Sequence, residues 1–206
     1  MIHRTPFFIP FLYPSLQWRI ETGEKEIFLT FDDGPVPGPT DFVLETLEKY
    51  KAKATFFCIG DNVRKHTSTL MKVSEAGHLV ANHTHNHLKG WTVSVDSYLR
   101  NIKKCELEIS SHGLTPSMLF RPPYGRIRRS QILALKEYRI VMWDVLTFDY
   151  DERMSPEKCL KGSLKAARPG SIVVFHDSYK AERNVTYTLP RFLDHLSEAG
   201  YSFKLL

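Results

Sequence analysis

The chain has 206 residues, 42% of them hydrophobic and 25% charged, and a formal net charge of +5 at pH 7. This is ordinary globular composition, with enough chain for one large domain or two small ones. No apolar segment is long enough for a membrane-spanning helix, and the lysines and arginines are scattered, so we expect neither a membrane span nor a nucleic-acid partner.

Residues 1–18, MIHRTPFFIPFLYPSLQW, are rich in apolar and aromatic side chains, as a targeting segment would be. However, prolines interrupt the apolar stretch, and no small-residue cleavage site follows it. We therefore expect residues 1–25 to form an extended lead-in that packs on the domain of residues 26–206. We favour a cytoplasmic protein over a secreted one.

From residue 26 onward, patterns typical of strands and of helices alternate. Short β-branched and aromatic runs indicate strands, and apolar residues at three- and four-residue spacing indicate helices. Gly77 and Gly200 end two of the helices, and Pro156 stands in the first turn of another. In chain order the predicted elements are strand 26–31, helix 40–51, strand 54–60, helix 67–76, strand 78–82, helix 95–111, strand 118–121, helix 129–137, strand 140–145, helix 156–167, strand 171–176, helix 188–199 and strand 201–205.

This alternation predicts an α/β fold with parallel strands covered by helices, either an open doubly wound sheet or a barrel. Polar residues able to do chemistry follow one predicted strand after another. Because the carboxyl ends of parallel strands meet at one rim, these residues should form a single site. They are Asp32, Asp33, His83 to His87, Arg121 to Tyr124, Asp144, Asp149, His176 and Asp177.

The segment NHTHNH, residues 82–87, holds three of the chain's nine histidines. On a strand, His83, His85 and His87 would share one face and offer three ligands. In a helical or tight turn, only His83 and His87 would lie together. Neutral imidazoles at four-residue spacing are typical zinc ligands, and a carboxylate as third ligand would leave a position for water.

Three further segments carry chemical groups. In TFDDGP, residues 30–35, the adjacent aspartates cannot point the same way, so one could hold a metal while the other takes a proton. In FRPPYG, residues 120–125, prolines stiffen the loop, the arginine could pair with a rim carboxylate, and the glycine would let the backbone approach a ligand closely. In VVFHDS, residues 173–178, a histidine leaves a buried strand and could act as acid or base.

In this order, TFDDGP, NHTHNH, RPPYG, WDVLTFDY and VFHD resemble the five motifs of the polysaccharide deacetylases of carbohydrate esterase family four, the NodB-homology fold. The resemblance covers nearly everything from about Ile27 to the C-terminus. It implies a deformed (β/α) barrel of about seven parallel strands with a groove over the strand ends. It also implies metal-dependent removal of N-acetyl groups from an acetylated amino-sugar polymer or oligomer of chitin or peptidoglycan type.

Matched by position, the resemblance implies that Asp33, His83 and His87 bind one divalent metal, with zinc favoured over cobalt and nickel. Asp32 resembles the general base of the family, and Arg121 resembles the partner that orients this base. The base would take a proton from water that attacks the acetyl carbonyl.

The remaining roles follow from the same match. His176 resembles the general acid that protonates the departing amine, and Asp149 resembles the carboxylate that orients and tunes it. The backbone N–H of Tyr124 would help to hold the tetrahedral oxyanion. His85 is left as a supporting residue outside the metal site.

Two positions depart from the family pattern. The fourth motif ends in Tyr150 where a tryptophan is usual, and the fifth has Val174 where a leucine is usual. Both would alter the apolar wall of the acetyl pocket, and so substrate choice and rate rather than chemistry. Because every polar catalytic position is filled, we predict an active enzyme with an acetylated glycan as its substrate. The alternatives are a carbohydrate O-acetyl esterase on the same fold and a non-catalytic carbohydrate-binding relative.

Overall fold

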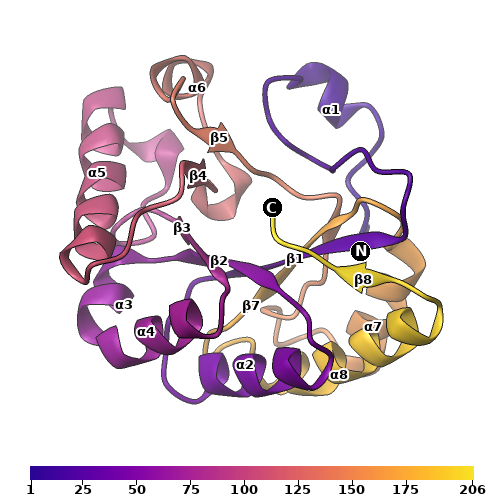
Figure 1. Cartoon of the computed structure of the whole chain (residues 1–206). Helices are drawn as coiled ribbons and strands as arrows, with labels where there is room; N and C mark the ends of the chain where they lie inside the picture. Colours follow the sequence, from indigo (N-terminus) through magenta and orange to yellow (C-terminus); the bar gives the residue numbers. More distant parts are fainter.

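A computed structural model describes residues 1–206, and Figure 1 shows the course of the chain. The strands are β1 (Glu26–Asp32), β2 (Ala54–Cys58), β3 (Leu79–Asn82), β4 (Leu119–Phe120), β5 (Arg139–Ile140), β6 (Val145–Leu146), β7 (Ile172–His176) and β8 (Ser202–Phe203). The helices are α1 (Ile9–Leu12), α2 (Pro39–Lys49), α3 (Gly60–Lys65), α4 (Thr67–Glu75), α5 (Val95–Ser111), α6 (Arg129–Ala134), α7 (Pro156–Ala166) and α8 (Glu182–Glu198). None of these helices combines the length and the apolar character needed to cross a bilayer.

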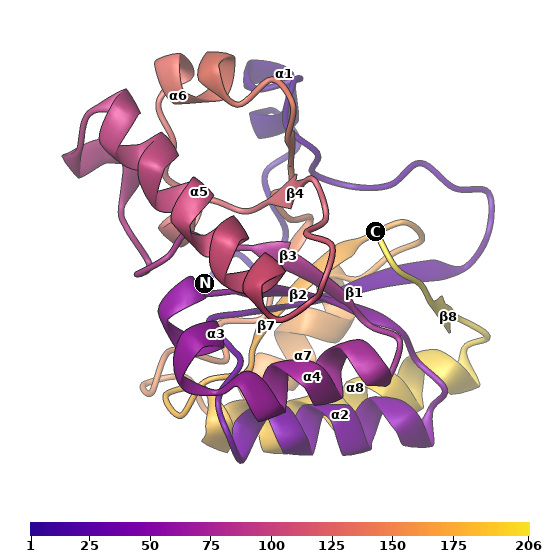
Figure 2. The same ribbon diagram turned by 60° about the vertical axis from the view of Figure 1, so that its left-hand side comes forward.

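Seven strands form one curled sheet in the order β5-β4-β3-β2-β1-β7-β6, and β8 pairs with the start of β1. Every strand pairing is parallel. In both views α2, α4, α7 and α8 lie along one side of the sheet, and α1 and α6 stand on the other side (Figures 1 and 2). The fold confirms the predicted deformed barrel of about seven parallel strands.

The main apolar core lies between the central strands and the helices that cover them. The ring of Phe31 in β1 stacks on the rings of Phe56 and Phe175, with centroid distances of 5.0 Å and 5.8 Å. Phe192 of α8 packs edge-on against Phe175 at 5.6 Å. Because parallel strands covered in this way are buried, their sequences are almost continuously apolar. This packing holds the ends of β1 and β7 in place at the rim.

The lead-in crosses the open edge of the sheet between β5 and β6. Arg4 forms an antiparallel bridge with β6, and Gln17 forms a parallel bridge with Val141, directly after β5. Leu16 is buried in a second apolar cluster beneath α6. Helix α1 itself buries no side chain, and Phe11 is 78% exposed. The lead-in is therefore attached to the sheet on both sides of an exposed α1.

The predicted strand over residues 140–145 is wrong, because the structure has two short strands there. β5 pairs with β4 at one edge of the sheet, and β6 pairs with β7 at the other edge. Between them, the N–H of Met142 donates to the carbonyl of Gln17 at 2.7 Å, and the N–H of Asp144 donates to Ile172 at 3.0 Å. The apolar run thus passes from one edge of the curled sheet to the other, instead of following one neighbouring strand.

Two helix predictions also need correction, and the short helices α1 and α3 were missed. Helix α8 begins at Glu182 rather than at residue 188, because Val185 and Leu189 already face the core at helical spacing. Helix α6 ends at Ala134 instead of residue 137. The short helix α3 was not predicted, since six residues beginning with a glycine give too few turns for a periodic pattern.

Candidate active site

A cavity of about 530 Å³ opens at the carboxyl ends of the strands. It brings together polar groups from the ends of β1, β3 and β7 and from the loop after β4. Tyr150 and Val174, the two departures from the family pattern, both line its wall. The lining residues are Asp32, Asp33, His83, His87, Pro122, Tyr124, Gly125, Arg126, Trp143, Leu146, Tyr150, Val174, His176 and Lys180.

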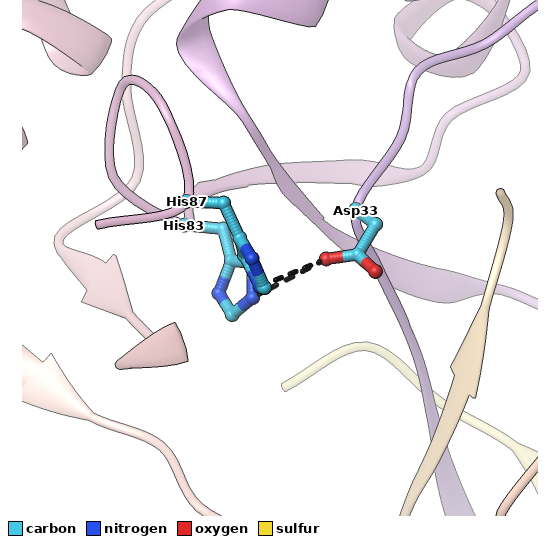
Figure 3. A group of neighbouring side chains, drawn as sticks. All are labelled: Asp33, His83 and His87. Atoms are coloured by element: carbon cyan, nitrogen blue, oxygen red, sulfur yellow. Dashed lines mark ion pairs between the residues drawn. The ribbon is translucent and has the colours of Figure 1, made fainter. Parts of the chain in front are cut away.

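The histidine segment is a tight turn and not a strand. β3 ends at Asn82, whose side-chain oxygen accepts a hydrogen bond from the N–H of Thr84 at 2.8 Å. Thr84 and His87 both have positive φ angles, of 66° and 56°, which fold the chain back. As a result, Nε2 of His83 and Nε2 of His87 lie 3.7 Å and 3.2 Å from Oδ1 of Asp33 (Figure 3).

His85, the middle histidine of the segment, points away from Asp33. The N–H of His85 donates to Oδ1 of Asn101 in α5 at 2.9 Å. The ring of His85 packs on Gly60 so closely that a β-carbon at Gly60 would lie 2.6 Å from Nδ1. His85 therefore joins the turn to α3 and α5 and does not face the cavity.

The side chains of Asp33, His83 and His87 fit a small divalent metal. Each offers one ligand atom, and these atoms lie within 4.8 Å of one another. Oδ1 of Asp33 is buried and has no hydrogen-bond partner. Nδ1 of His83 lies 2.8 Å from the carbonyl oxygen of Arg121, which fixes the proton on Nδ1 and turns Nε2 toward Asp33. Burial lowers the pKa of His83 to about 4, so the ring is neutral, as a ligand must be.

Asp32 is held by a completely buried arginine. Nη1 of Arg121 donates to Oδ1 of Asp32 at 2.6 Å and to the hydroxyl of Thr30 at 2.8 Å. The guanidinium also donates to two backbone carbonyls and lies 4.1 Å from the ring of Phe57. Burial alone would raise the pKa of Asp32, but the charge of Arg121 keeps that pKa below its usual value. Asp32 is therefore an ionised carboxylate with a fixed direction.

His176 and Asp149 form a second fixed pair. Oδ2 of Asp149 accepts from the backbone N–H of His176, and Oδ1 lies 2.7 Å from Nδ1 of the same residue. Although burial lowers the pKa of His176, the charge and the hydrogen bond of Asp149 outweigh it and raise that pKa to about 9. His176 is therefore protonated at neutral pH, with Nε2 left to face the cavity.

The loop after β4 presents Tyr124 in the left-handed region, with φ at 61°. Its backbone N–H has no acceptor among the hydrogen bonds of the chain. Its ring lies 4.6 Å from that of His87, centroid to centroid. The neighbouring Gly125 was expected to approach a ligand. It lines the cavity, and it also makes room for Trp143, since a β-carbon there would lie 2.5 Å from the indole ring.

Two aspartates at strand ends do not line the cavity. Asp144 accepts hydrogen bonds from the guanidinium of Arg168 at 2.8 and 3.0 Å, away from the cavity. Asp177 is buried, and it accepts from the N–H of Gly34 at 3.0 Å and from the hydroxyl of Thr40 at 2.6 Å. Asp177 thus supports the loop that carries Asp33.

Sequence reasoning missed several residues at the cavity wall. Trp143, which lies within the apolar run predicted as one strand, lines the cavity. Arg126, Leu146 and Lys180 had no assignment, although each follows a motif residue closely enough to suggest the same rim.

A curled α/β barrel with a carboxylate, a protonated imidazole and a metal-ligand cluster at its strand ends has the groups of a hydrolase. A sequence model of the polysaccharide deacetylase family matches residues 19–143. A peptidoglycan-N-acetylglucosamine deacetylase of Bacillus cereus is 35% identical over 192 residues, which cover 90% of this chain and 88% of that protein. A chitooligosaccharide deacetylase of Rhizobium leguminosarum bv. trifolii is 34% identical over 159 residues, 75% of this chain and 72% of that protein.

The crystal structure of the Bc1960 peptidoglycan N-acetylglucosamine deacetylase, in complex with a naphthalenyl N-oxidanyl-benzamide, matches this fold with a TM-score of 0.90 and 28% identity. The match covers 98% of this chain and 95% of that one. The chain belongs to the polysaccharide deacetylase family, carbohydrate esterase family four. It is a polysaccharide deacetylase of this metal-dependent family, and the two relatives named above deacetylate peptidoglycan and chitooligosaccharides.

Proposed function

We propose that this enzyme removes N-acetyl groups from an acetylated amino-sugar polymer or oligomer of peptidoglycan or chitin type. The observation that carries the proposal is the division of roles between two adjacent carboxylates. Asp33 is directed at two histidines, and Asp32 is ionised and directed by a buried arginine. The names of the relatives in Bacillus cereus and Rhizobium leguminosarum support the choice of substrate.

Asp33, His83 and His87 would hold one divalent ion. Two imidazoles and one carboxylate favour zinc, with cobalt and nickel as alternatives. When bound, the ion supplies Lewis acidity, which polarises an acyl oxygen and acidifies water.

Asp32 acts as the general base. Its carboxylate lies at the cavity floor, and the hydrogen bond from Arg121 leaves one oxygen free to take a proton from the attacking water. The same hydrogen bond prevents the side chain from turning away. As the acetyl carbon becomes tetrahedral, the unused N–H of Tyr124 is available to donate to the developing oxyanion.

His176 acts as the general acid. The Nδ1 hydrogen bond to Asp149 leaves the Nε2 proton for the departing amine, which would otherwise be too basic to leave. Tyr150 packs edge-on against this ring at 4.9 Å and restricts its movement. The acid and the base thus come from neighbouring strands, since Asp32 pairs with His176 in the register of β1 and β7.

Acetate release from a panel of substrates tests this proposal. We expect the zinc-loaded enzyme to release acetate from N-acetylglucosamine oligomers or peptidoglycan and to lose this activity when a chelator removes the metal. Release from acetylated xylan alone would favour the O-acetyl esterase. Binding of acetylated glycans without release by the zinc, cobalt or nickel form would favour the non-catalytic alternative.

A further inference from the structure

Two cationic side chains line the cavity, and a third lies next to one of its lining residues. Lys180 lines one wall, and its Nζ lies 5.8 Å from the ring centre of Tyr150. Arg126 also lines the cavity, and its guanidinium lies 5.1 Å from the ring centre of Trp91. Lys89 is not a lining residue, but its Nζ lies 5.9 Å from the ring centre of Tyr124, which lines the cavity. These cations come from three separate loops, and two of them line the same cavity as Asp32 and His176.

None of the three cations has an acidic partner within the chain. Six other surface cations do lie 3.1 Å or less from a carboxylate, namely Arg64, Lys65, Lys72, Lys103, Arg153 and Arg168. Asp151 is close enough for the charge of Lys180 to lower its pKa, but both of its oxygens accept hydrogen bonds from Arg153. No carboxylate of the surrounding surface thus forms an ion pair with Lys180, Arg126 or Lys89.

The acidic groups inside the cavity do not neutralise these cations either. The charge of Asp32 is matched by Arg121, and that of Asp149 is matched by protonated His176. The remaining carboxylate of the site is that of Asp33, and its Oδ1 is directed at His83 and His87. A metal ion at that position would add positive charge, so the mouth and floor together favour an anionic ligand.

We propose that Lys180, Arg126 and Lys89 form an anion-binding subsite, and that it selects acetylated glycans with a carboxylate next to the deacetylated sugar. This inference rests on the proposed deacetylase function and narrows its substrate class. A neutral N-acetylglucosamine chain can be bound by aromatic faces and hydrogen bonds alone. A glycan with carboxylates on its sugars would gain charge-assisted contacts with these unpaired cations as well as electrostatic attraction during approach.

A matched pair of substrates tests the subsite. One is a tetrasaccharide of alternating N-acetylglucosamine and N-acetylmuramic acid with free lactyl carboxylates, and the other is the same tetrasaccharide with these carboxylates amidated. For the zinc-loaded enzyme at low ionic strength, we expect kcat/KM to be about tenfold higher for the free acid. This ratio should shrink toward one in about 1 M salt, where the screening length is only about 3 Å.

Two double variants test whether the cations at the cavity cause the difference in kcat/KM between the two tetrasaccharides. In Arg126→Gln/Lys180→Gln, we expect the ratio of the two kcat/KM values to fall about tenfold, close to one. The control Lys49→Gln/Lys158→Gln removes the same charge from exposed lysines outside the cavity and should keep the wild-type ratio. Circular dichroism would verify that both double variants are folded.

Two outcomes would overturn the subsite while leaving the deacetylase function intact: a wild-type ratio near one, or a ratio that the cavity variant and the control change equally. If the zinc-loaded enzyme releases no acetate from either tetrasaccharide or from the neutral N-acetylglucosamine tetramer, the proposed function fails, and the subsite fails with it.

Discussion

Asp32 and Asp33 are adjacent, yet the backbone between them makes their environments differ. Asp32 is the last residue of β1 and is held by the ladder and by Arg121. Asp33 follows with a φ of 81°, and its carbonyl accepts a hydrogen bond from Asn62 at 2.7 Å. This left-handed step turns the side chain of Asp33 toward the histidine turn. One backbone conformation thus separates the proposed base, Asp32, from the proposed metal ligand, Asp33.

The pairing of Asp149 with His176 leads to a pH prediction. An acid must hold its proton to give it away, so kcat should fall as the pH rises through the pKa of His176, which Asp149 raises to about 9. Asp149→Asn removes the negative charge that raises the pKa of His176. We therefore expect the fall of kcat at basic pH to move to lower pH by about one unit or more. The pH profile of kcat measures the shift, and an unchanged profile would show that another group titrates.

The position of His85 leads to a second prediction. His85→Ala should bind zinc with nearly wild-type affinity, because the ring faces α3 and α5 and not Asp33. It should lower the free energy of unfolding by about 1–3 kcal/mol, the usual cost of emptying a buried site of this size. Chelator competition and urea unfolding measure the two quantities. His83→Ala is the comparison, and equal losses of zinc affinity in both variants would make His85 a ligand.

At the scale of elements, the lead-in completes the sheet where β5 and β6 separate. The N–H of Gln17 donates to the carbonyl of Ile140 at 2.9 Å, and the N–H of Thr5 donates to Asp144 at 2.8 Å. These bonds satisfy backbone groups that the missing strand pairing would leave free. The segments of the lead-in before and after α1 are thus hydrogen-bonded to the sheet, whereas α1 itself buries no side chain.

This difference predicts the response to two alanine substitutions. Leu16→Ala removes a buried side chain from the second apolar cluster and should cost about 2–4 kcal/mol of unfolding free energy. Phe11→Ala removes a larger but exposed side chain from α1 and should cost less than about 0.5 kcal/mol. Equal costs in urea unfolding would contradict the description of the lead-in as two attached segments around an exposed helix.

At the scale of the whole molecule, the parallel sheet gathers residues that are far apart in the chain. This convergence is predictable from the sequence, since each motif follows a strand and parallel strands share a rim. Sequence analysis could not decide between a strand and a turn at NHTHNH, because the positive φ angles of Thr84 and His87 depend on hydrogen bonds within the folded loop. It also failed where the partner is distant, as for Asp144 with Arg168 and for the division into β5 and β6.

The central claim is that Asp32 is a base and Asp33 a metal ligand, and parallel analysis of Asp32→Asn and Asp33→Asn tests it most directly. The measurement is zinc content together with acetate release from N-acetylglucosamine oligomers. We expect Asp32→Asn to keep one zinc per chain and to lose activity by about 10³-fold, and Asp33→Asn to lose the zinc itself. An Asp32→Asn enzyme that turns over at nearly the wild-type rate would contradict the account.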